Sequence, residues 1–323
     1  MEDYPRTLEE FEGRFVTEQA CREYLMRLRW PRGFACPRCG GQRARPSPRR
    51  GLLSCGQCAY QASVTAGTIF QDTRLPLRTW YRAMWWVTSQ KTGASALGLQ
   101  SILGLGSYGT AWALLHKLRR AMVRPGRERL TGRVEVDETF VGGEEKGVRG
   151  RQTLKKALVV IAAEEDGAGI GRIRMKRIRR ASKQQLHGFI QEAVEPDSTI
   201  HTDGWEGYVG LEALGYRHEY DLVATSSQSA SELLPRVHRL AALLKRWLMG
   251  THQGAVSREH LDHYLDEYTF RFNRRRSRHR GKLFYRLVQQ AAAVGPTTYS
   301  EGVKCIPNFL VKVAKNRVTH LLL

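Results

Sequence analysis

The sequence predicts a multidomain protein in which a small cysteine-stapled module and a helical segment precede an α/β domain with a mixed sheet. Three observations predict this order. Two C-x-x-C pairs lie within residues 36–58, a helical periodicity broken by glycines covers residues 76–122, and strand-like segments begin at residue 133. A chain of 323 residues is long enough for two or three domains. The predicted divisions are residues 1–66, 67–126 and 130–300, followed by a tail at 301–323.

The unusual feature of the composition is its charge. The 52 lysines and arginines outnumber the 31 aspartates and glutamates, which gives a net charge of +21 and a pI near 10.1. Such a balance favours polyanionic partners, nucleic acid first and anionic membrane second. No apolar run approaches the roughly 18 residues that a membrane-spanning helix needs. Residues 1–14 carry five acidic residues and no apolar core, so we expect no signal peptide, no membrane contact and a cytoplasmic protein.

The cysteine spacing predicts one structural zinc ion. Two C-x-x-C pairs separated by fifteen residues form the pattern of a four-thiolate zinc ribbon, in which Gly40 and Gly56 let the chain turn around the metal. The predicted ligands are Cys36, Cys39, Cys55 and Cys58. Arginines of the spacer, Arg43 and Arg45 among them, are predicted to contact DNA phosphates. A solvated basic face without a partner is the alternative.

Residues 91–120 have the pattern of a helix-turn-helix. We expect a first helix at 93–103, a turn at 104–106 and a second helix at 107–120 that Ser107 caps. The second helix would present polar and basic side chains to the groove and phosphates of DNA. This set comprises Tyr108, Thr110, His116, Lys117, Arg119 and Arg120. The alternative is a pair of core helices joined by a glycine turn.

The segment after residue 130 changes to strand-like alternation and then to helical periodicity. Strands are predicted at 133–141, 157–163, 169–175, 198–202 and, in the tail, 309–313. Helices are predicted at 182–194, 205–214, 235–249 and 257–273. Three consecutive strands followed by strand and helix in alternation indicate an α/β domain with a mixed sheet.

Two aspartates at strand positions are the candidate catalytic residues. In the first strand, Glu135 and Asp137 face the side opposite to Val134 and Val136. An acid inside an apolar strand is costly to bury unless it meets a cation. Asp203 ends a second, short apolar strand. Two strand-borne carboxylates that converge in one sheet suit a pair of divalent ions for phosphoryl transfer. A turn or cap role for each aspartate is the alternative.

Several motifs occur in a recognisable order after the cysteine pairs and the helical segment. They are RVEVDETFVGG at 133–143, GRQTLKK at 150–156, HTDGWEGY at 201–208 and YLDEYTFRFNRR at 264–275. In this order the chain resembles the bacterial insertion-sequence transposases with a ribonuclease-H-like DDE domain, and more narrowly insertion sequence family 1595. The resemblance extends over residues 36–276.

The resemblance implies a ribonuclease-H-like fold for the α/β domain and an enzyme that cuts and joins DNA strands. It implies two catalytic Mg²⁺ or Mn²⁺ ions and double-stranded DNA partners, both transposon ends and target. The N-terminal modules would recognise terminal inverted repeats. A homo-oligomer assembled on DNA at the bacterial nucleoid is the expected working form.

The third metal ligand is where this sequence departs from the family. Enzymes that this chain resembles carry Glu or Asn seven residues before a lysine on a late helix, and here His238 stands seven residues before Lys245. Seven residues are nearly two helical turns, so the two side chains would share a face. We expect Asp137, Asp203 and His238 to hold the ions, and Lys245 to contact DNA near the scissile phosphate.

Two alternatives stay open. Glu267 on the following helix is the rival third ligand, although a helix-stabilising pair with Arg271 at i+4 explains it as well. Mg²⁺ prefers oxygen over the imidazole nitrogen of His238, whereas Mn²⁺ tolerates nitrogen better. The histidine therefore also leaves open a noncatalytic protein, a domesticated or decayed transposase that binds DNA through its N-terminal modules alone.

Overall fold

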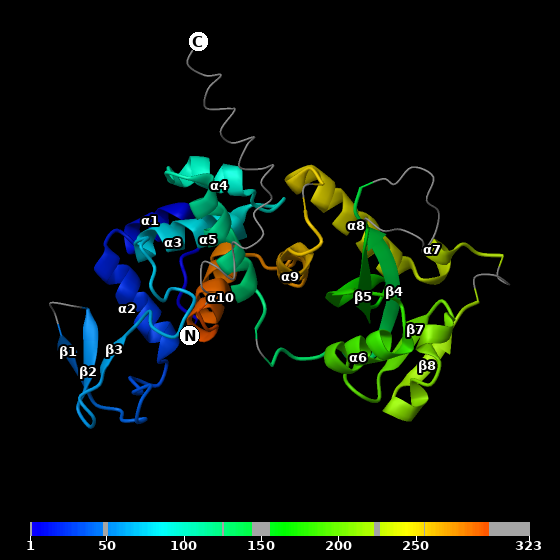
Figure 1. Ribbon diagram of the computed structural model, residues 1–323, viewed down its shortest axis with the longest axis horizontal. Helices are drawn as coiled ribbons and strands as arrows, with labels where there is room; N and C mark the ends of the chain where they lie inside the picture. Colours follow the sequence, from blue (N-terminus) through cyan, green and yellow to red (C-terminus); the bar gives the residue numbers. More distant parts are fainter. Residues whose placement is uncertain are drawn as a thin grey trace, which may run out of the picture. The chain divides into compact units, whose positions relative to one another are not determined.

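The computed structural model describes residues 2–47, 51–124, 126–143, 156–222, 227–254 and 256–296 (Figure 1). The chain divides into two compact units. The first comprises Met1–Pro125 with Ser277–Leu323, and the second is Gly126–Arg276. The tail at 301–323, with the strand expected at 309–313, lies outside the described residues, as does most of the basic GRQTLKK motif. In the described part of the chain, no helix is both long and apolar enough to cross a membrane.

The first unit is a three-stranded sheet accompanied by helices. Its strands are β1 (Ala44–Ser47), β2 (Leu52–Cys55) and β3 (Gln61–Ser63), which pair antiparallel in chain order. Its helices are α1 (Leu8–Arg14), α2 (Glu18–Arg29), α3 (Leu77–Ser89), α4 (Ala96–Leu103), α5 (Tyr108–Ala121) and α10 (Arg280–Ala293). The zinc-ribbon sheet and the helical segment that the sequence predicts are therefore both present.

Aromatic side chains hold the helices of the first unit together. Phe284 of α10 is fully buried, and its ring centroid lies 5.3 Å from that of Phe11, 5.6 Å from that of Phe15 and 5.6 Å from that of Tyr81. The predicted boundary at residue 300 is therefore wrong for α10, which packs with helices from the start of the chain. The predicted segments 1–66 and 67–126 likewise share one compact unit.

The second unit contains a five-stranded sheet and its covering helices. Its strands are β4 (Arg133–Val141), β5 (Ala157–Asp166), β6 (Gly169–Ile178), β7 (Thr199–Thr202) and β8 (Arg217–Tyr220). Its α-helices are α6 (Lys183–Ala193), α7 (Ala230–Leu233), α8 (Pro235–His252) and α9 (Leu261–Phe272). Two short 3₁₀ helices, η2 (Glu206–Tyr208) and η3 (Glu212–Leu214), stand where the sequence predicts one helix, because Gly207 and Gly210 interrupt it.

The sheet has the strand order β6-β5-β4-β7-β8. β4, β5 and β6 pair antiparallel, whereas β4–β7 and β7–β8 are parallel, which confirms the predicted mixed sheet. Three antiparallel strands extended by parallel ones on the side of the first strand are the arrangement of the ribonuclease-H-like fold. β8 was not predicted because its four residues are mostly exposed and polar.

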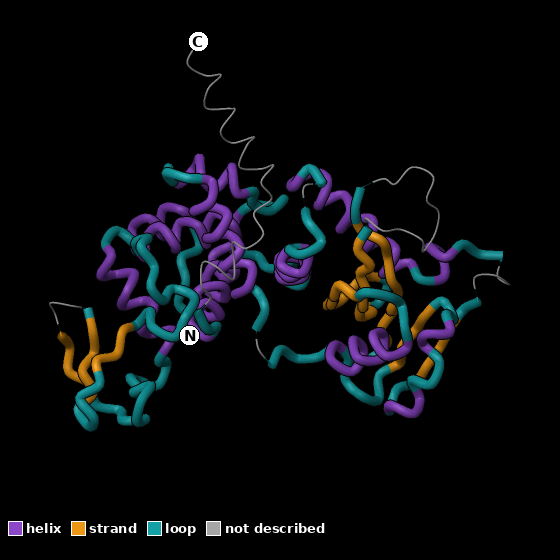
Figure 2. The backbone as a smooth tube through the Cα atoms, viewed as in Figure 1, coloured by secondary structure: helices purple, strands orange, loops and turns teal. Residues whose placement is uncertain are grey.

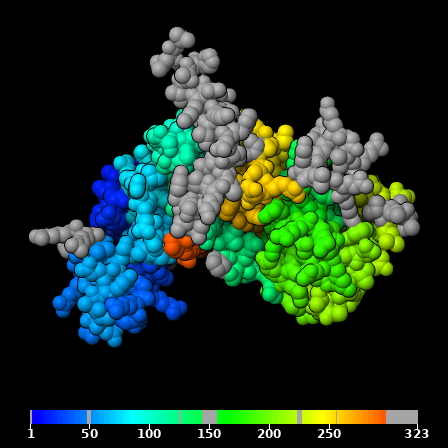
Figure 3. Space-filling model, in the orientation of Figure 1, coloured from blue at the N-terminus to red at the C-terminus, as the bar shows by residue number. Residues whose placement is uncertain are grey.

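Helices cover both faces of this sheet (Figure 2). Val134 and Val136 pack with α6 in one core, whereas Val141 and Ile161 pack with α8 and α9 in the other. The space-filling view shows the yellow atoms of α8 against the green strands (Figure 3). Because side chains alternate along a strand, Glu135 and Asp137 lie on the α8 side, as the sequence predicts.

Candidate active site and DNA-contacting modules

The four predicted zinc ligands converge in the first unit. The sulfur of Cys36 lies 3.7 Å from that of Cys58, and the sulfur of Cys39 lies 3.6 Å from that of Cys55. All four sulfurs lie within 4.8 Å of one another. A tetrahedron with metal–sulfur bonds of about 2.3 Å has edges of about 3.8 Å between its sulfurs. The cluster therefore fits one zinc ion.

Backbone amides favour the thiolate form of one of these cysteines, Cys55. The amides of Gln57 and Cys58 lower the pKa of Cys55 to about 6, and the Gln57 N–H donates to the Cys55 sulfur at 3.4 Å. Gly40 adopts a left-handed φ of 73° after the first pair, as a knuckle turn requires. In the second pair the left-handed residue is Ala59, with φ 56°, so the expected role of Gly56 is wrong.

Loss of one zinc ligand is expected to unfold the ribbon. Cys36→Ser should lower bound zinc from one ion per chain toward zero and weaken DNA binding, because the short strands β1–β3 have little core without the metal. Metal analysis of the purified protein measures this, with Cys21→Ala as the control because Cys21 is buried outside the cluster. Full zinc occupancy in Cys36→Ser would show that these thiolates are not the ligands.

The predicted helix-turn-helix forms with nearly the expected bounds. α4 ends at Leu103, and Gly104 caps it with a left-handed φ of 61°. α5 begins after Ser107, whose hydroxyl accepts the N–H of Thr110 at 3.1 Å. The structure thus confirms the helix, the glycine turn and the serine cap.

The expected exposure of α5 is only partly correct. Arg120 is exposed, and Tyr108, Thr110 and Lys117 are half-buried, but His116 and Arg119 are only 5% and 1% exposed. The His116 ring lies against Trp112, with centroids 3.8 Å apart, and its Nε2 is 3.3 Å from Arg119 Nη1. His116 and Arg119 are therefore not exposed as the sequence predicts, and their contact with DNA stays a prediction. In the ribbon, Arg43 and Arg45 are exposed as expected.

Asp137 and His238 face each other between the sheet and α8. His238 Nε2 lies 3.6 Å from Asp137 Oδ2. The other carboxylate oxygen of Asp137 accepts the N–H of Glu138 at 2.8 Å, which fixes the orientation of the group. His238, which the sequence singles out because it stands seven residues before Lys245, therefore lies next to the strand that carries Asp137.

Asp203 follows the strand that neighbours β4. β7 runs parallel to β4 with Glu135 opposite His201, and Asp203 directly follows the end of β7. The charges of Asp137 and Asp203 both raise the pKa of the buried Tyr208, so both carboxylates lie near this residue. Neighbouring strands lie about 4.8 Å apart. The Asp203 carboxylate accepts the N–H of Trp205 at 3.0 Å. In the described part of the chain, the ligand atoms of Asp137, Asp203 and His238 do not all lie within 4.8 Å of one another. The three side chains are therefore spread more widely than the four cysteine sulfurs of the ribbon.

The electrostatics of this site suit metal ligation by the histidine. Burial lowers the pKa of His238, while Glu135 and Asp203 oppose the shift and Lys245 adds to it. The lowered pKa favours the neutral ring, and a neutral imidazole is the form that ligates metals. Burial also lowers the pKa of Lys245, which the charge of Asp137 counteracts.

Glu267, the rival third ligand, lies in a different part of the second unit. Its carboxylate is fully buried and accepts the Nε–H of Arg271 at 2.8 Å, one helical turn away. Its helix, α9, packs on the edge strand β6, whereas α8 packs on β4 and β5. The geometry therefore favours the ion pair over metal ligation for Glu267.

Glu135 is a residue whose role the sequence left open. Its carboxylate is 1% exposed and accepts the N–H groups of Arg236 and Val237, at 2.8 and 3.0 Å, at the start of α8. Arg236 Nη1 also donates to it at 2.7 Å and lies 3.1 Å from Glu165. The signal in the sequence was an acid within a buried apolar strand, which requires a cation. Glu135 thus fixes the start of α8, three residues before His238.

Removing this carboxylate is expected to destabilise the second unit strongly. Glu135→Ala leaves the largely buried Arg236 guanidinium without its main partner and should cost roughly 3–5 kcal/mol of unfolding free energy. Urea unfolding followed through the tryptophans of the second unit measures the loss. Glu165→Gln is the matched control, because Glu165 is more exposed and also pairs with Arg133. A loss below about 1 kcal/mol in Glu135→Ala would contradict this clamp.

Two family models match this chain, one in each of its two compact units. Residues 129–273 match the model of the ISXO2-like transposase domain, and residues 16–61 match that of the transposase zinc-ribbon domain. The first match ends close to the boundary of the second unit at Arg276.

A protein of a transposable element is among the relatives. The chain is 26% identical over 278 residues to an uncharacterized protein in transposable element ISH50 of Halobacterium salinarum, covering 80% of this chain and 91% of the relative. Among solved structures, the Mos1 transposase paired-end complex with left transposon end is 13% identical, with 69% of this chain and 77% of that chain covered at a TM-score of 0.29. The Mos1 strand transfer complex is 12% identical, with 66% and 75% covered at a TM-score of 0.28. The zinc-ribbon model and the transposase-domain model thus match this chain in the order that the sequence predicts.

Proposed function

We propose that this protein is a metal-dependent transposase that cleaves DNA strands at the ends of its insertion sequence and joins them to a target. The observation that carries the proposal is the approach of His238 Nε2 to Asp137 Oδ2, at 3.6 Å, on the strand next to Asp203. A carboxylate pair on adjacent parallel strands, completed by a neutral imidazole from a covering helix, is a donor set for divalent ions.

Each residue of this site has a separate task. Asp137, Asp203 and His238 hold two Mg²⁺ or Mn²⁺ ions, which when bound stabilise the charge on the attacking and leaving oxygens of the phosphodiester. Lys245 is exposed on α8, and the charge of the nearby Asp137 counteracts the lowering of its pKa by burial. Its ammonium group binds a phosphate beside the scissile bond. Glu135 orients the start of α8, so that His238 stays opposite Asp137.

The first unit supplies recognition of double-stranded DNA. Exposed Arg43 and Arg45 of the ribbon neutralise phosphates. On α5, Arg120 with the half-buried Tyr108 and Lys117 reads or positions the terminal inverted repeat. A homo-oligomer that holds two transposon ends, at the bacterial nucleoid, is the working form.

Cleavage of end-labelled DNA tests the proposal. The DNA flanking the gene supplies the inverted repeats, and the duplex that carries them is incubated with the full chain in Mg²⁺ or Mn²⁺. We expect nicks at the repeat boundary and, with target DNA added, joined products, with neither in chelator. A protein that shifts this DNA on a gel but cuts it in no metal would be the noncatalytic binder, the outcome that the histidine at position 238 makes the main competitor.

A further inference from the structure

We infer that the second unit holds a phosphate-binding site for the DNA backbone in a pocket on the side of α8 turned toward α9. The inference rests on the proposed function, since its ligand is the DNA of the transposition reaction. The pocket, called here the arginine pocket, has a volume of about 450 Å³. Its walls are the β5–β6 turn, the first half of α8 and the end of α9. Its basic members are Arg236, Arg239, Arg275 and Arg276.

The charges in the arginine pocket are only partly compensated. Arg236 is neutralised by Glu135 and Glu165, as described above. Arg276 Nη1 lies 2.5 Å from Asp166, so that pair is also balanced. The nearby acids are therefore occupied by arginines of the pocket wall.

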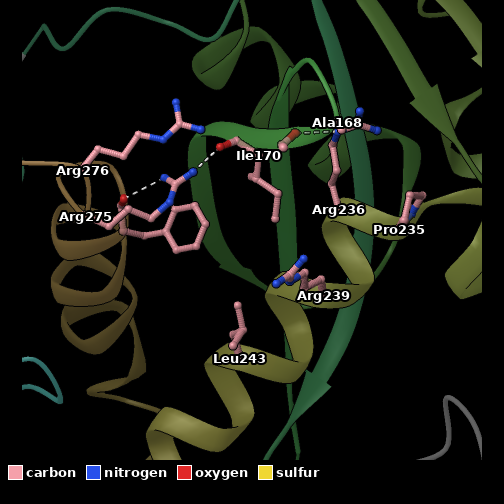
Figure 4. Close-up of a pocket in the computed structure, with 10 residues that line it drawn as sticks. Ala168, Ile170, Pro235, Arg236, Arg239, Leu243, Arg275 and Arg276 are labelled. Atoms are coloured by element: carbon pink, nitrogen blue, oxygen red, sulfur yellow. Dashed lines mark hydrogen bonds between the residues drawn. The ribbon is translucent and has the colours of Figure 1, made fainter.

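Arg239 and Arg275 provide the excess positive charge. Arg239 is exposed and forms no hydrogen bond or ion pair with the described part of the chain. Within the described residues, Arg275 donates to carbonyl oxygens and to no carboxylate: its Nη1 lies 3.2 Å from Gly171 O and 2.9 Å from Phe272 O, and its Nη2 donates to Ile170 O. Figure 4 shows Arg239 on α8 and Arg275, which follows the end of α9, on opposite sides of the pocket. These two guanidinium groups thus have no partner anion among the residues that the structure describes.

The guanidinium of Arg275 is also held in place before any ligand binds. It lies over the ring of Phe272, 3.9 Å from the centroid, while three hydrogen bonds to carbonyl oxygens set its direction. Burial and the charge of Arg276 lower the pKa of Arg275, and the charge of Asp166 opposes this shift only in part. A phosphate at the pocket would compensate this positive charge at little cost in side-chain entropy.

The position of the pocket relative to the candidate active site identifies the ligand. Arg239 directly follows His238 on α8, so one helix turn carries a metal-site residue toward the sheet and an open arginine toward the pocket. Two open guanidinium groups on separate elements suit a ligand with successive phosphates better than a single small anion. The DNA backbone next to the scissile bond has this chemistry, and the +21 chain is built to bind it.

The salt dependence of DNA binding tests the pocket. Each phosphate contact contributes about 0.9 to the slope of log affinity against log salt. Arg239→Ala in the full chain should therefore lower the slope for the transposon-end duplex by about 0.9 and weaken binding roughly five-fold at 0.15 M salt. Fluorescence anisotropy without divalent metal measures both quantities. The matched control is Lys183→Ala, which removes the same charge from α6 on the other face of the sheet and should leave the slope unchanged.

A chemical readout on the wild-type chain complements the variant. Phenylglyoxal should modify Arg239 in the free protein, and transposon-end DNA should protect it when the peptides are compared by mass spectrometry. A mononucleotide at the same phosphate concentration should not protect, because it lacks successive phosphates. Protection by the mononucleotide alone would identify a small-anion site and overturn the assignment to DNA.

The result separates this inference from the proposed function. In one outcome, the wild type cuts no DNA while Arg239→Ala still lowers the salt slope and DNA still protects Arg239 from phenylglyoxal. That result would contradict the proposed function and support the arginine pocket as a DNA-binding site. If the wild type cleaves while Arg239→Ala and Lys183→Ala keep equal slopes, the arginine pocket does not contact DNA.

Discussion

Replacing Asp137 or Asp203 by alanine is expected to abolish strand cleavage and to leave binding to transposon-end DNA nearly unchanged. Stabilisation of charge on phosphoryl oxygens by a bound metal is worth several kcal/mol, and each 1.36 kcal/mol corresponds to a factor of ten, so we expect a loss on the order of 10³-fold or more. The loss should be similar for both residues, because two carboxylates on adjacent strands share the same ions.

Single-turnover cleavage of labelled DNA and anisotropy on the same duplex measure the two quantities separately. Asp197→Asn is the matched control: Asp197 is an exposed aspartate just before β7, with a left-handed φ of 64° that asparagine tolerates. It lies at the opposite end of that strand from Asp203 and should cleave like the wild type. Full cleavage by Asp137→Ala or Asp203→Ala would remove that residue from the site.

The sheet was largely predictable because strand alternation is a local signal. The bounds of β4 match the prediction, and the face assigned to Asp137 is the face on which α8 lies. The family resemblance, through the seven-residue spacing to Lys245, singled out His238, and its ring nitrogen lies 3.6 Å from Asp137. Its role as a metal ligand stays a prediction.

Contacts between segments distant in sequence were not predictable in the same way. α10 packs beside Phe11 through Phe284, and no local pattern states which core an amphipathic helix will join. Arg119 looked like a surface arginine, yet it is buried beside His116, because polarity alone does not identify the solvent-facing side of a helix. The need of Glu135 for a cation was visible, but its partner lies 101 residues away.

The identity of the third ligand gives the second large effect. His238→Ala is expected to reduce cleavage at least 100-fold, since even residues that only support a metal ligand are worth 10- to 100-fold. Glu267→Gln should cleave at a rate within about two-fold of the wild-type rate. Glu267 pairs with Arg271 on its own helix, so its replacement should remove no metal ligand. The comparison uses equal concentrations of Mg²⁺ and Mn²⁺ in parallel reactions.

Metal preference distinguishes ligation from a merely structural role of the histidine. Mn²⁺ accepts nitrogen ligands better than Mg²⁺, so the wild type should cleave at least as well with Mn²⁺. His238→Glu, which restores an oxygen ligand, should retain activity and shift the ratio of rates toward Mg²⁺. A structural defect would lower both rates together and leave the ratio unchanged. If instead His238→Ala cleaves normally and Glu267→Gln is inactive, Glu267 is the ligand, and α9 must approach β4 when DNA is bound.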